Sequence, residues 1–475
     1  MPTGHKWRPI TDFEHDPKTL TDGELGPLSR VWERQKAELI EQGTLSEFEK
    51  RLRREWSIET GIIENVYTLD RGVTRTLIEK GIDAALIPHG ASNRDGVLVA
   101  RIIQDHYDAL EVMFDFVGRT RELSTGYIKE MHAALLRNQE TYMVVDQFGR
   151  AFEKQLEKGQ YKATPNSPMR PDGALHEYCP PEHVASEMDR LVALHKEHEA
   201  RGIVPEVEAA WLHHRFTQIH PFSDGNGRVA RAVATLVFIK SGWFPLIVKR
   251  DQWTQYIDAL EKADSDDLRP LVAMFVEAQR DTLILASEVA YDVKPVESPH
   301  DAIIAVRDRL LQRGRLPHPE WLAAKKTAGQ LFQSSILQRL RQTAAELTAE
   351  TVGGKGLSFT VGSVAQMSDK TRSRLDEWIG HTVDYDEYGR TAQLTLNTGR
   401  VASLFLSLYA IGPKFRGLIG VVALLRLEGQ DTLIPIKSGT FQINYEETLE
   451  AAQARISPWL DRVIAEGLNE WRRTL

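Results

Sequence analysis

The chain has 475 residues, of which 42% are hydrophobic and 27% charged, and this composition is typical of a folded protein rather than a disordered or fibrous one. Because a single hydrophobic core rarely grows beyond about 250–300 residues, the length predicts two or three domains. The net charge of -8 argues against a dedicated nucleic-acid-binding protein, which would carry a strongly basic face.

The lone cysteine, Cys179, excludes an internal disulfide framework and any site built from several cysteines. The segment from Met1 to Asp12 is polar and has no apolar stretch typical of a signal peptide, and no long uncharged apolar run follows it. We therefore expect a cytoplasmic protein that does not span a membrane.

In chain order, residues 1–95 are expected to form a helical N-terminal region. A short helical segment is predicted around Leu28 to Ile40 and an amphipathic helix over about 47–64. In the second helix, apolar side chains recur at helical spacing, namely Phe48, Leu52, Trp56 and Ile63.

Residues 96–292 are expected to form a helical core. Its predicted helices span about 96–117, 124–138, 182–199, 204–219, 228–239, 253–262 and 268–288. The segment 147–181 is rich in Gly, Pro and turn residues, and it predicts an exposed flap with a hairpin turn at Asp172 and Gly173. A polar run with two prolines, residues 293–300, is the expected linker.

Residues 301–475 are expected to form an α+β domain, so the predicted fold class is mainly α with a C-terminal α+β domain. Helices should extend to Thr351, and a last helix should span about 446–472. The predicted strands are 357–361, 391–397, 401–409, 418–427 and 432–436.

Twelve residues, His220 to Arg231, contain the elements that a phosphate-transfer site needs. Gly225 and Gly227 lack a Cβ and allow the backbone N–H groups of the turn to close around an anion. The turn leads directly into the N-terminus of a predicted helix, whose unpaired amides and dipole favour phosphate.

Four side chains in this segment have matching chemistry. Arg228 and Arg231 are three residues apart on the first turn of the helix, so both guanidinium groups can project to the same side and form charge-assisted contacts with phosphate oxygens. Asp224 offers a hard oxygen ligand for Mg²⁺. His220, as a neutral imidazole, can take the proton of an incoming hydroxyl group.

The segment His220 to Arg231 resembles the signature of the Fic family, HPFx(D/E)GNGRxxR, whose members mostly transfer AMP from ATP to protein hydroxyl groups. The resemblance covers roughly residues 55–285 and implies a helical Fic core with a small β-hairpin flap that docks the target. It implies roles for the site residues: His220 as general base, Asp224 as Mg²⁺ ligand, Gly225, Asn226 and Gly227 as anion nest, and Arg228 and Arg231 as ligands of the β and γ phosphates. Gly227, in place of the lysine of the family's phosphorylating toxins, favours AMP transfer.

The segment from Thr60 to Asn65 resembles the family's inhibitory motif, (S/T)xxxE(G/N). This resemblance implies that Glu64 pairs with Arg231 and removes the guanidinium group that the γ phosphate needs.

The predicted partners are ATP, Mg²⁺ and a protein with a free Ser, Thr or Tyr hydroxyl, with a homo-oligomer as a further expectation and no nucleic acid or membrane. Three alternatives remain open: transfer of UMP or a phosphoryl group, removal of AMP, and a nucleotide-binding sensor without transferase activity. Four further histidines lack the spacing of a zinc site and are interpreted as core or surface residues: His195, His198, His213 and His214.

Overall fold

The chain forms two compact units, each made of two stretches of sequence. The computed structural model describes residues 5–42, 45–119, 121–145, 150–169, 173–288, 319–351, 357–364, 375, 378–379, 381–398, 400–412, 415–429, 433–436 and 440–474. The N-terminal unit comprises Met1–Asp22 and Ser46–Thr282, and the C-terminal unit comprises Gly23–Leu45 and Leu283–Leu475. The expected linker, residues 293–300, lies outside the described residues.

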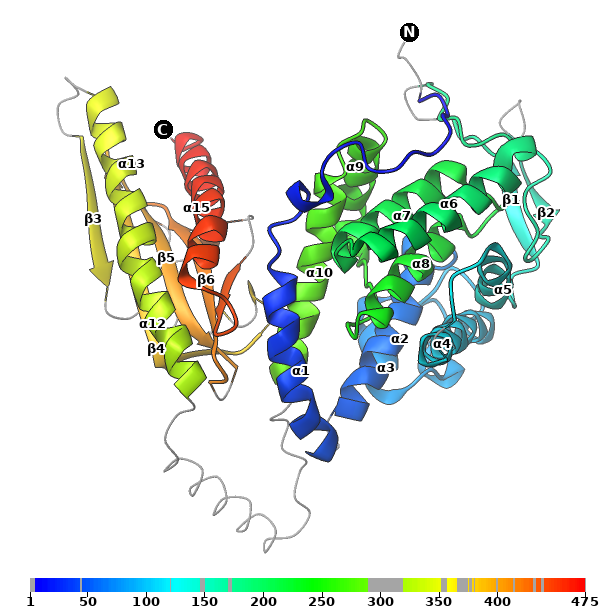
Figure 1. Ribbon diagram of the computed structural model, residues 1–475, viewed down its shortest axis with the longest axis horizontal. Helices are drawn as coiled ribbons and strands as arrows, with labels where there is room; N and C mark the ends of the chain where they lie inside the picture. The colour runs from blue at the N-terminus through cyan, green and yellow to red at the C-terminus, as the bar shows by residue number, and fades with distance from the viewer. Residues whose placement is uncertain are drawn as a thin grey trace, which may run out of the picture. The chain divides into compact units, whose positions relative to one another are not determined.

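The N-terminal unit is helical (Figure 1). Its helices are α2 (Leu45–Ile63), α3 (Arg71–Lys80), α4 (Gly96–Gly118), α5 (Thr125–Leu135), α6 (Pro181–Arg201), α7 (Pro205–Ile219), α8 (Asn226–Lys240), α9 (Trp253–Ala263) and α10 (Arg269–Glu288), which continues past the end of the unit. Short 3₁₀ helices are η1 (Pro17–Thr19), η2 (Ala84–Leu86) and η3 (Arg250–Gln252).

Helix α8 lies at the centre of this unit. Helices α4, α5 and α7 all contact it, and its residues are buried along most of its length. Most of the buried side chains of this helix are apolar, as expected where no face of a helix meets water, but its first turns also bury Arg228 and Arg231. The helix that begins at the motif is therefore held rigidly by the core.

A two-stranded antiparallel hairpin precedes α6, formed by β1 (Thr141–Val145) and β2 (Ala151–Gln155). It begins upstream of the hairpin that the sequence predicted. Strand β2 falls inside the predicted flap, residues 147–181. Around the turn expected at Asp172 and Gly173, the described pairing is a single bridge between Met169 and Leu175, and Gly173 has a left-handed φ of 81°. Asp172 lies outside the described residues. The β-branched and aromatic residues of β1 favour a strand, but the Gly- and Pro-rich stretch after β2 was the stronger turn signal.

The C-terminal unit contains an antiparallel sheet with the order β3-β4-β5-β6-β7, in which β8 also pairs with β6. Its strands are β3 (Ser358–Val364), β4 (Val383–Asn397), β5 (Val401–Ile411), β6 (Leu418–Arg426), β7 (Ile434–Pro435) and β8 (Phe441–Asn444). Helices α12 (Pro319–Leu331), α13 (Leu337–Glu350) and α15 (Leu449–Arg472) pack against the sheet, and a π-helical turn (Phe332–Ile336) joins α12 to α13 (Figure 1). The predicted mainly helical fold with a C-terminal α+β domain is confirmed.

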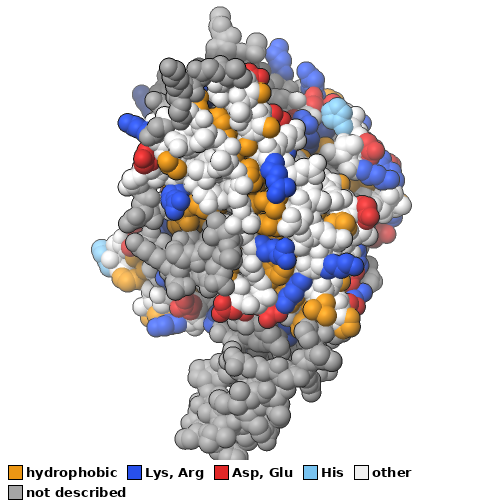
Figure 2. Space-filling model, turned by 90° about the vertical axis from the view of Figure 1, so that its left-hand side faces the viewer, with side chains coloured by type: hydrophobic (Ala, Val, Ile, Leu, Met, Phe, Trp, Pro, Cys, Tyr) orange, Lys and Arg blue, Asp and Glu red, His pale blue; other side chains and the backbone are white. Residues whose placement is uncertain are grey.

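On the side of this unit that Figure 2 faces, basic, acidic and hydrophobic side chains are interspersed. No helix in the described ranges is both long enough and apolar enough to cross a membrane.

Helix α1 (Leu25–Gln42) belongs to the C-terminal unit, whereas the sequence grouped it with residues 1–95. It contacts β8 and buries Trp32, which is 1% exposed. Glu24, just before the helix, forms a buried ion pair with Arg455 of α15 at 2.8 Å. Helical periodicity shows that α1 has an apolar face, but it does not show which element covers that face. For this reason the sequence assigned α1 to the wrong unit.

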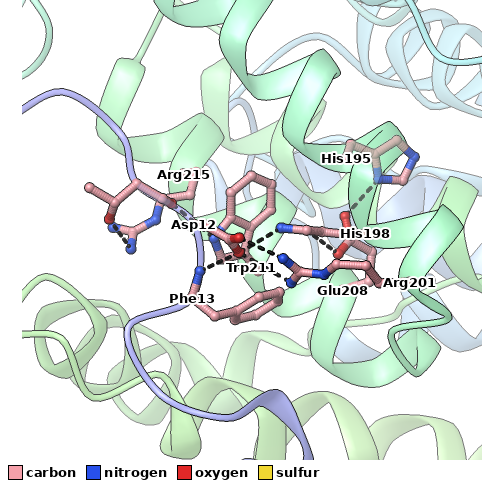
Figure 3. A network of polar contacts seen from close by, with 9 residues as sticks. Asp12, Phe13, His195, His198, Arg201, Glu208, Trp211 and Arg215 are labelled. Atoms are coloured by element: carbon pink, nitrogen blue, oxygen red, sulfur yellow. Dashed lines mark hydrogen bonds and ion pairs between the residues drawn. The ribbon is translucent and has the colours of Figure 1, made fainter.

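The segment before α1 is fastened to α6 and α7 by a polar network (Figure 3). Asp12 accepts hydrogen bonds from His198 Nε2 at 2.9 Å and from Arg201 Nη1 at 2.6 Å. The backbone oxygen of Thr11 accepts the indole N–H of Trp211 at 3.3 Å. These contacts hold an otherwise irregular stretch of chain in one place.

Behind Asp12, the carboxylate of Glu208 lies between two histidines. Its oxygens lie 2.6 Å from His195 Nδ1 and 2.7 Å from His198 Nδ1. Burial disfavours the charged form of His195, but hydrogen bonds to Glu199 and Glu208 raise its pKa to about 9. His195 and His198 are thus buried core residues rather than surface ones, two possibilities that the sequence left open, and they join α6 to α7.

Candidate active site

The loop between α7 and α8 is shaped by two left-handed residues. His220, with a φ of 50°, ends α7, and Gly225, with a φ of 77°, begins α8 without a side-chain cap. The left-handed φ of Gly225 favours glycine, and a Cβ there would also lie 2.7 Å from Leu136 Cδ2. The first amides of α8 consequently have no capping side chain and can meet an anion.

Asn226 closes this loop with its side chain. Its Oδ1 accepts the N–H of Phe222 at 2.9 Å, and its Nδ2 donates to the backbone oxygen of Phe222 at 2.7 Å. The same oxygen accepts a bond from Asn166 Nδ2 at 2.8 Å. The backbone N–H of Lys162 donates to Pro221 at 2.8 Å. The side chain of Asn226 is therefore engaged within the loop, which leaves its backbone for the predicted anion nest.

Asp224 stands at the rim of the loop and is held from two sides. Its Oδ2 accepts bonds from Gln139 Nε2 at 2.6 Å and from Arg228 Nη2 at 3.4 Å. Its backbone oxygen accepts a bond from His132 Nε2 at 3.1 Å, while His132 Nδ1 accepts the N–H of Gly159 at 2.8 Å. Burial lowers the pKa of His132 to about 4, which agrees with a neutral ring that donates at one nitrogen and accepts at the other.

Arg228 is a buried cation with unused donors. Its side chain is 1% exposed, and its Nε and Nη1 have no hydrogen-bond partner within the part of the chain that the structure describes. Burying unpaired guanidinium N–H groups is costly unless a ligand accepts them. Together with the uncapped start of α8, they fit an anionic group.

Arg231 lies one turn further along α8, and its guanidinium group is hydrogen-bonded to residues at the end of α2. Its Nη1 donates to Glu64 Oε1 at 2.7 Å. Its Nε and Nη2 donate to Thr60 Oγ1 at 3.2 Å and 3.0 Å, and Nη2 also donates to the Thr60 backbone oxygen at 3.0 Å. The predicted pair of Glu64 and Arg231 is present in the structure.

The carboxylate of Glu64 also lies against the first turn of α8. A Cβ built on Gly227 would be 2.2 Å from Glu64 Oε1, so the absence of a side chain at Gly227 makes room for this carboxylate. Glu64 therefore occupies part of the predicted anion nest.

The end of α2 is built to deliver Glu64 to this point. Asn65 adopts a left-handed φ of 52°, which asparagine tolerates, and the N–H of Val66 donates back to Gly61 at 3.0 Å. Gly61 packs against the Tyr67 ring so closely that a Cβ would lie 2.5 Å from its hydroxyl oxygen. Thr60 and Glu64, four residues apart, thus face Arg231 together.

His220 is half-buried, and its ring stacks face to face on Tyr178, with centroids 3.8 Å apart and planes 6° apart. Burial and the positive charge of Lys162 lower the pKa of His220 to about 3, so the ring is neutral at physiological pH. Nδ1 lies 3.3 Å from the backbone oxygen of Thr217, to which it can only donate. Nε2 is then the nitrogen that can accept a proton.

Residues 122–238 match the family model described as Fic/DOC family. This segment is a Fic domain. The chain resembles "Protein adenylyltransferase fic-1" of Caenorhabditis elegans, with 27% identity over 213 residues, 43% of this chain and 35% of that protein. It also resembles "Protein adenylyltransferase Fic" of Aedes aegypti, with 34% identity over 93 residues, 19% of each chain.

The chain spans about a third or less of the length of these relatives. Among solved structures, a Fic-domain-containing signaling protein from Bacteroides thetaiotaomicron covers 57% of this chain and 99% of its own, with 22% identity and a TM-score of 0.46.

The structure brings all the predicted site residues of the Fic domain into one region around the start of α8, together with Glu64 from α2. Sequence reasoning did not find the residues that hold the loop and ring in place, namely His132, Gln139, Lys162, Asn166 and Tyr178. These side chains come from three separate segments before the motif, and no local spacing marks them.

Proposed function

We propose that the Fic domain transfers AMP from ATP to a Ser, Thr or Tyr hydroxyl group of a protein, and that Glu64 restrains this activity. The observation that carries the proposal is the carboxylate of Glu64, paired with Arg231 at 2.7 Å and set against Gly227 in the uncapped first turn of α8. The names of the relatives support the transfer of an adenylyl group.

The residues present fit ATP and Mg²⁺. The unpartnered donors of Arg228 and the free amides of α8 suit phosphate oxygens. Asp224 offers a carboxylate at the rim of the loop and would hold Mg²⁺, which, when bound, would neutralise phosphate charge.

His220 would act as the general base. Its Nε2 takes the proton of the attacking hydroxyl group while the hydroxyl oxygen bonds to the α phosphorus. The bond between that phosphorus and the oxygen leading to the β phosphate breaks, and pyrophosphate leaves. Because Tyr178 stacks on the face of the ring, it does not engage the lone pair of Nε2, which lies in the ring plane.

Glu64 would oppose this reaction in two ways. It keeps the guanidinium group of Arg231 from the phosphates, and it places a negative charge where the helix would bind one. If Glu64 moved away, both the guanidinium group of Arg231 and the amides of the first turn of α8 would become available to the phosphates. The cytoplasmic location and the homo-oligomer stay predictions.

The test is AMP transfer from labelled ATP with Mg²⁺ into added protein and into the chain itself. We expect Glu64→Ala to raise labelling by about 100-fold, because it frees a charge-assisted contact to the phosphates. Adding His220→Ala to Glu64→Ala should remove the signal.

The matched control is Glu55→Ala, which removes a carboxylate of α2 whose partner is Lys249 rather than Arg231. Its labelling should equal that of the wild type. No labelling by Glu64→Ala, or stronger labelling with UTP than with ATP, would refute the proposal of AMP transfer. Equal labelling by the wild type and Glu64→Ala would refute the restraint.

A further inference from the structure

Three side chains that are far apart in the sequence lie together next to the Fic motif. They are His5 of the N-terminal segment, His176 of the segment before α6, and Asp264, which follows the last residue of α9. Each offers one ligand atom, and these atoms lie within 4.8 Å of one another. We propose that His5, His176 and Asp264 bind a divalent transition-metal ion of the Zn²⁺ class.

The carboxylate of Asp264 is oriented for such a role. Its Oδ2 lies 3.8 Å from His176 Nε2, while its Oδ1 accepts a hydrogen bond from His214 Nε2 at 3.0 Å. His214 is buried on α7 and fixes the carboxylate from behind. A buried partner that orients a ligand through its second atom is a regular feature of metal sites.

The two histidines are held in place by their backbones. The N–H of Glu177 donates to the backbone oxygen of His5 at 3.0 Å, and the N–H of His176 donates to Pro168 at 3.0 Å. The rings of His5 and His176 are stacked, with centroids 4.6 Å apart. A tetrahedral ion with bonds of about 2.0–2.1 Å needs its ligand atoms about 3.3 Å apart, so small side-chain rotations would complete the site.

The ligand chemistry selects the kind of ion. Two imidazoles and one carboxylate suit Zn²⁺ and its first-row neighbours, whereas Mg²⁺ prefers oxygen ligands alone. All three residues are half-buried, so water can reach the site and can complete the coordination. The site is therefore distinct in chemistry from the Mg²⁺ position expected at Asp224.

The site is also close to the proposed base. Tyr178, two residues after His176, contacts the His176 ring edge to face at 4.9 Å and stacks on His220. A bound ion would fasten the segment that carries Tyr178 to the N-terminal segment and to the end of α9.

The test is zinc binding by the full chain after treatment with a chelator and dialysis. We expect the wild type to bind one Zn²⁺ per chain tightly, measured by competition with a chromogenic chelator and by elemental analysis. His5→Ala and His176→Ala should each weaken this binding by about 10- to 100-fold or more. His89→Ala, which removes an exposed histidine elsewhere, should bind like the wild type.

Co²⁺ gives a second readout, because its visible absorption reports coordination by nitrogen and a low coordination number. The band should appear in the wild type and vanish in His176→Ala. The absence of stoichiometric zinc, or unchanged affinity in both histidine variants, would overturn the proposal. Since no measurement uses AMP transfer, a failure here is separate from a failure of the proposed function.

Discussion

At the scale of single residues, the contact between Glu64 and Gly227 is the tightest constraint in the candidate site. The carboxylate fills the space where a side chain at position 227 would stand. The backbone of Gly227 does not have a left-handed φ, so the space and not the backbone geometry requires glycine here. The lack of a side chain at Gly227 thus makes room for the Glu64 carboxylate as well as for a bound phosphate.

We predict that Gly227→Ala lowers the free energy of unfolding by about 1–3 kcal/mol in the wild type, because its Cβ collides with Glu64. In a Glu64→Ala background, the same change should be neutral or stabilising by up to about 1 kcal/mol, since alanine favours a helix more than glycine does. Urea unfolding of the four proteins in this cycle measures the difference. Equal costs in the two backgrounds would mean that the two residues do not compete for space.

At the scale of elements, α6 and α7 are joined by buried charge as well as by apolar packing. His195 on α6 lies between Glu199 and Glu208, which raise its pKa to about 9. An unfolded histidine titrates near 6.5, so the folded state binds this proton more tightly. The resulting stabilisation is complete below about pH 6.5 and is lost as the pH rises through about 9.

We predict that His195→Gln lowers stability by up to about 3 kcal/mol at pH 6 and has a smaller effect near pH 9.5. Thermal unfolding of both proteins between pH 6 and pH 9.5 tests this. A His89→Gln control, at an exposed site, should follow the wild type at every pH. A difference between wild type and His195→Gln that does not shrink with rising pH would contradict the prediction.

The same scale shows how far sequence reasoning reaches. Elements with a strong local pattern were predicted close to their observed bounds, including α2, α8 and the strands β5 and β6. Strand β4 was predicted only from residue 391, although it begins at Val383. Strand β8, Phe441–Asn444, was not predicted, because four residues are too few to show a clear alternation. Its partner β6 is also separated from it in the sequence by β7, so no hairpin pattern marks the pair. The motif residues could be found because they are contiguous, whereas the ligand set of His5, His176 and Asp264 exists only after folding.

At the scale of the whole molecule, α1 belongs to a different unit from the segments on either side of it. Residues 5–22 and α2 lie in the N-terminal unit, while α1 lies in the C-terminal unit. Trp32 and the ion pair between Glu24 and Arg455 are buried parts of the C-terminal unit. A domain cut at residue 301 would therefore lack one of its own helices.

We predict that Trp32→Ala destabilises the C-terminal unit by about 3–5 kcal/mol, the usual cost of removing a buried aromatic side chain. Amide hydrogen exchange should accelerate in β8 and α15 and stay unchanged in α7 and α8. Trp56→Ala is the matched control, because Trp56 on α2 is equally buried and donates to Thr235 of α8 at 3.2 Å. Trp56→Ala should accelerate hydrogen exchange in α8 and not in β8. Faster exchange in α8 rather than β8 for Trp32→Ala would contradict the assignment of α1 to the C-terminal unit.

The place of α1 also has a consequence for synthesis on the ribosome. Glu24 and Arg455 are 431 positions apart, so α1 is translated long before α15, with which Glu24 pairs. At a translation rate of about 5–20 residues per second, the apolar face of α1 stays uncovered for roughly 20–90 s until its packing partners have been synthesised. During that time the N-terminal unit, whose residues are all translated earlier, can complete its own fold. The nascent chain then carries an exposed helix that a chaperone can bind, and the C-terminal unit can close only after α15 has been translated.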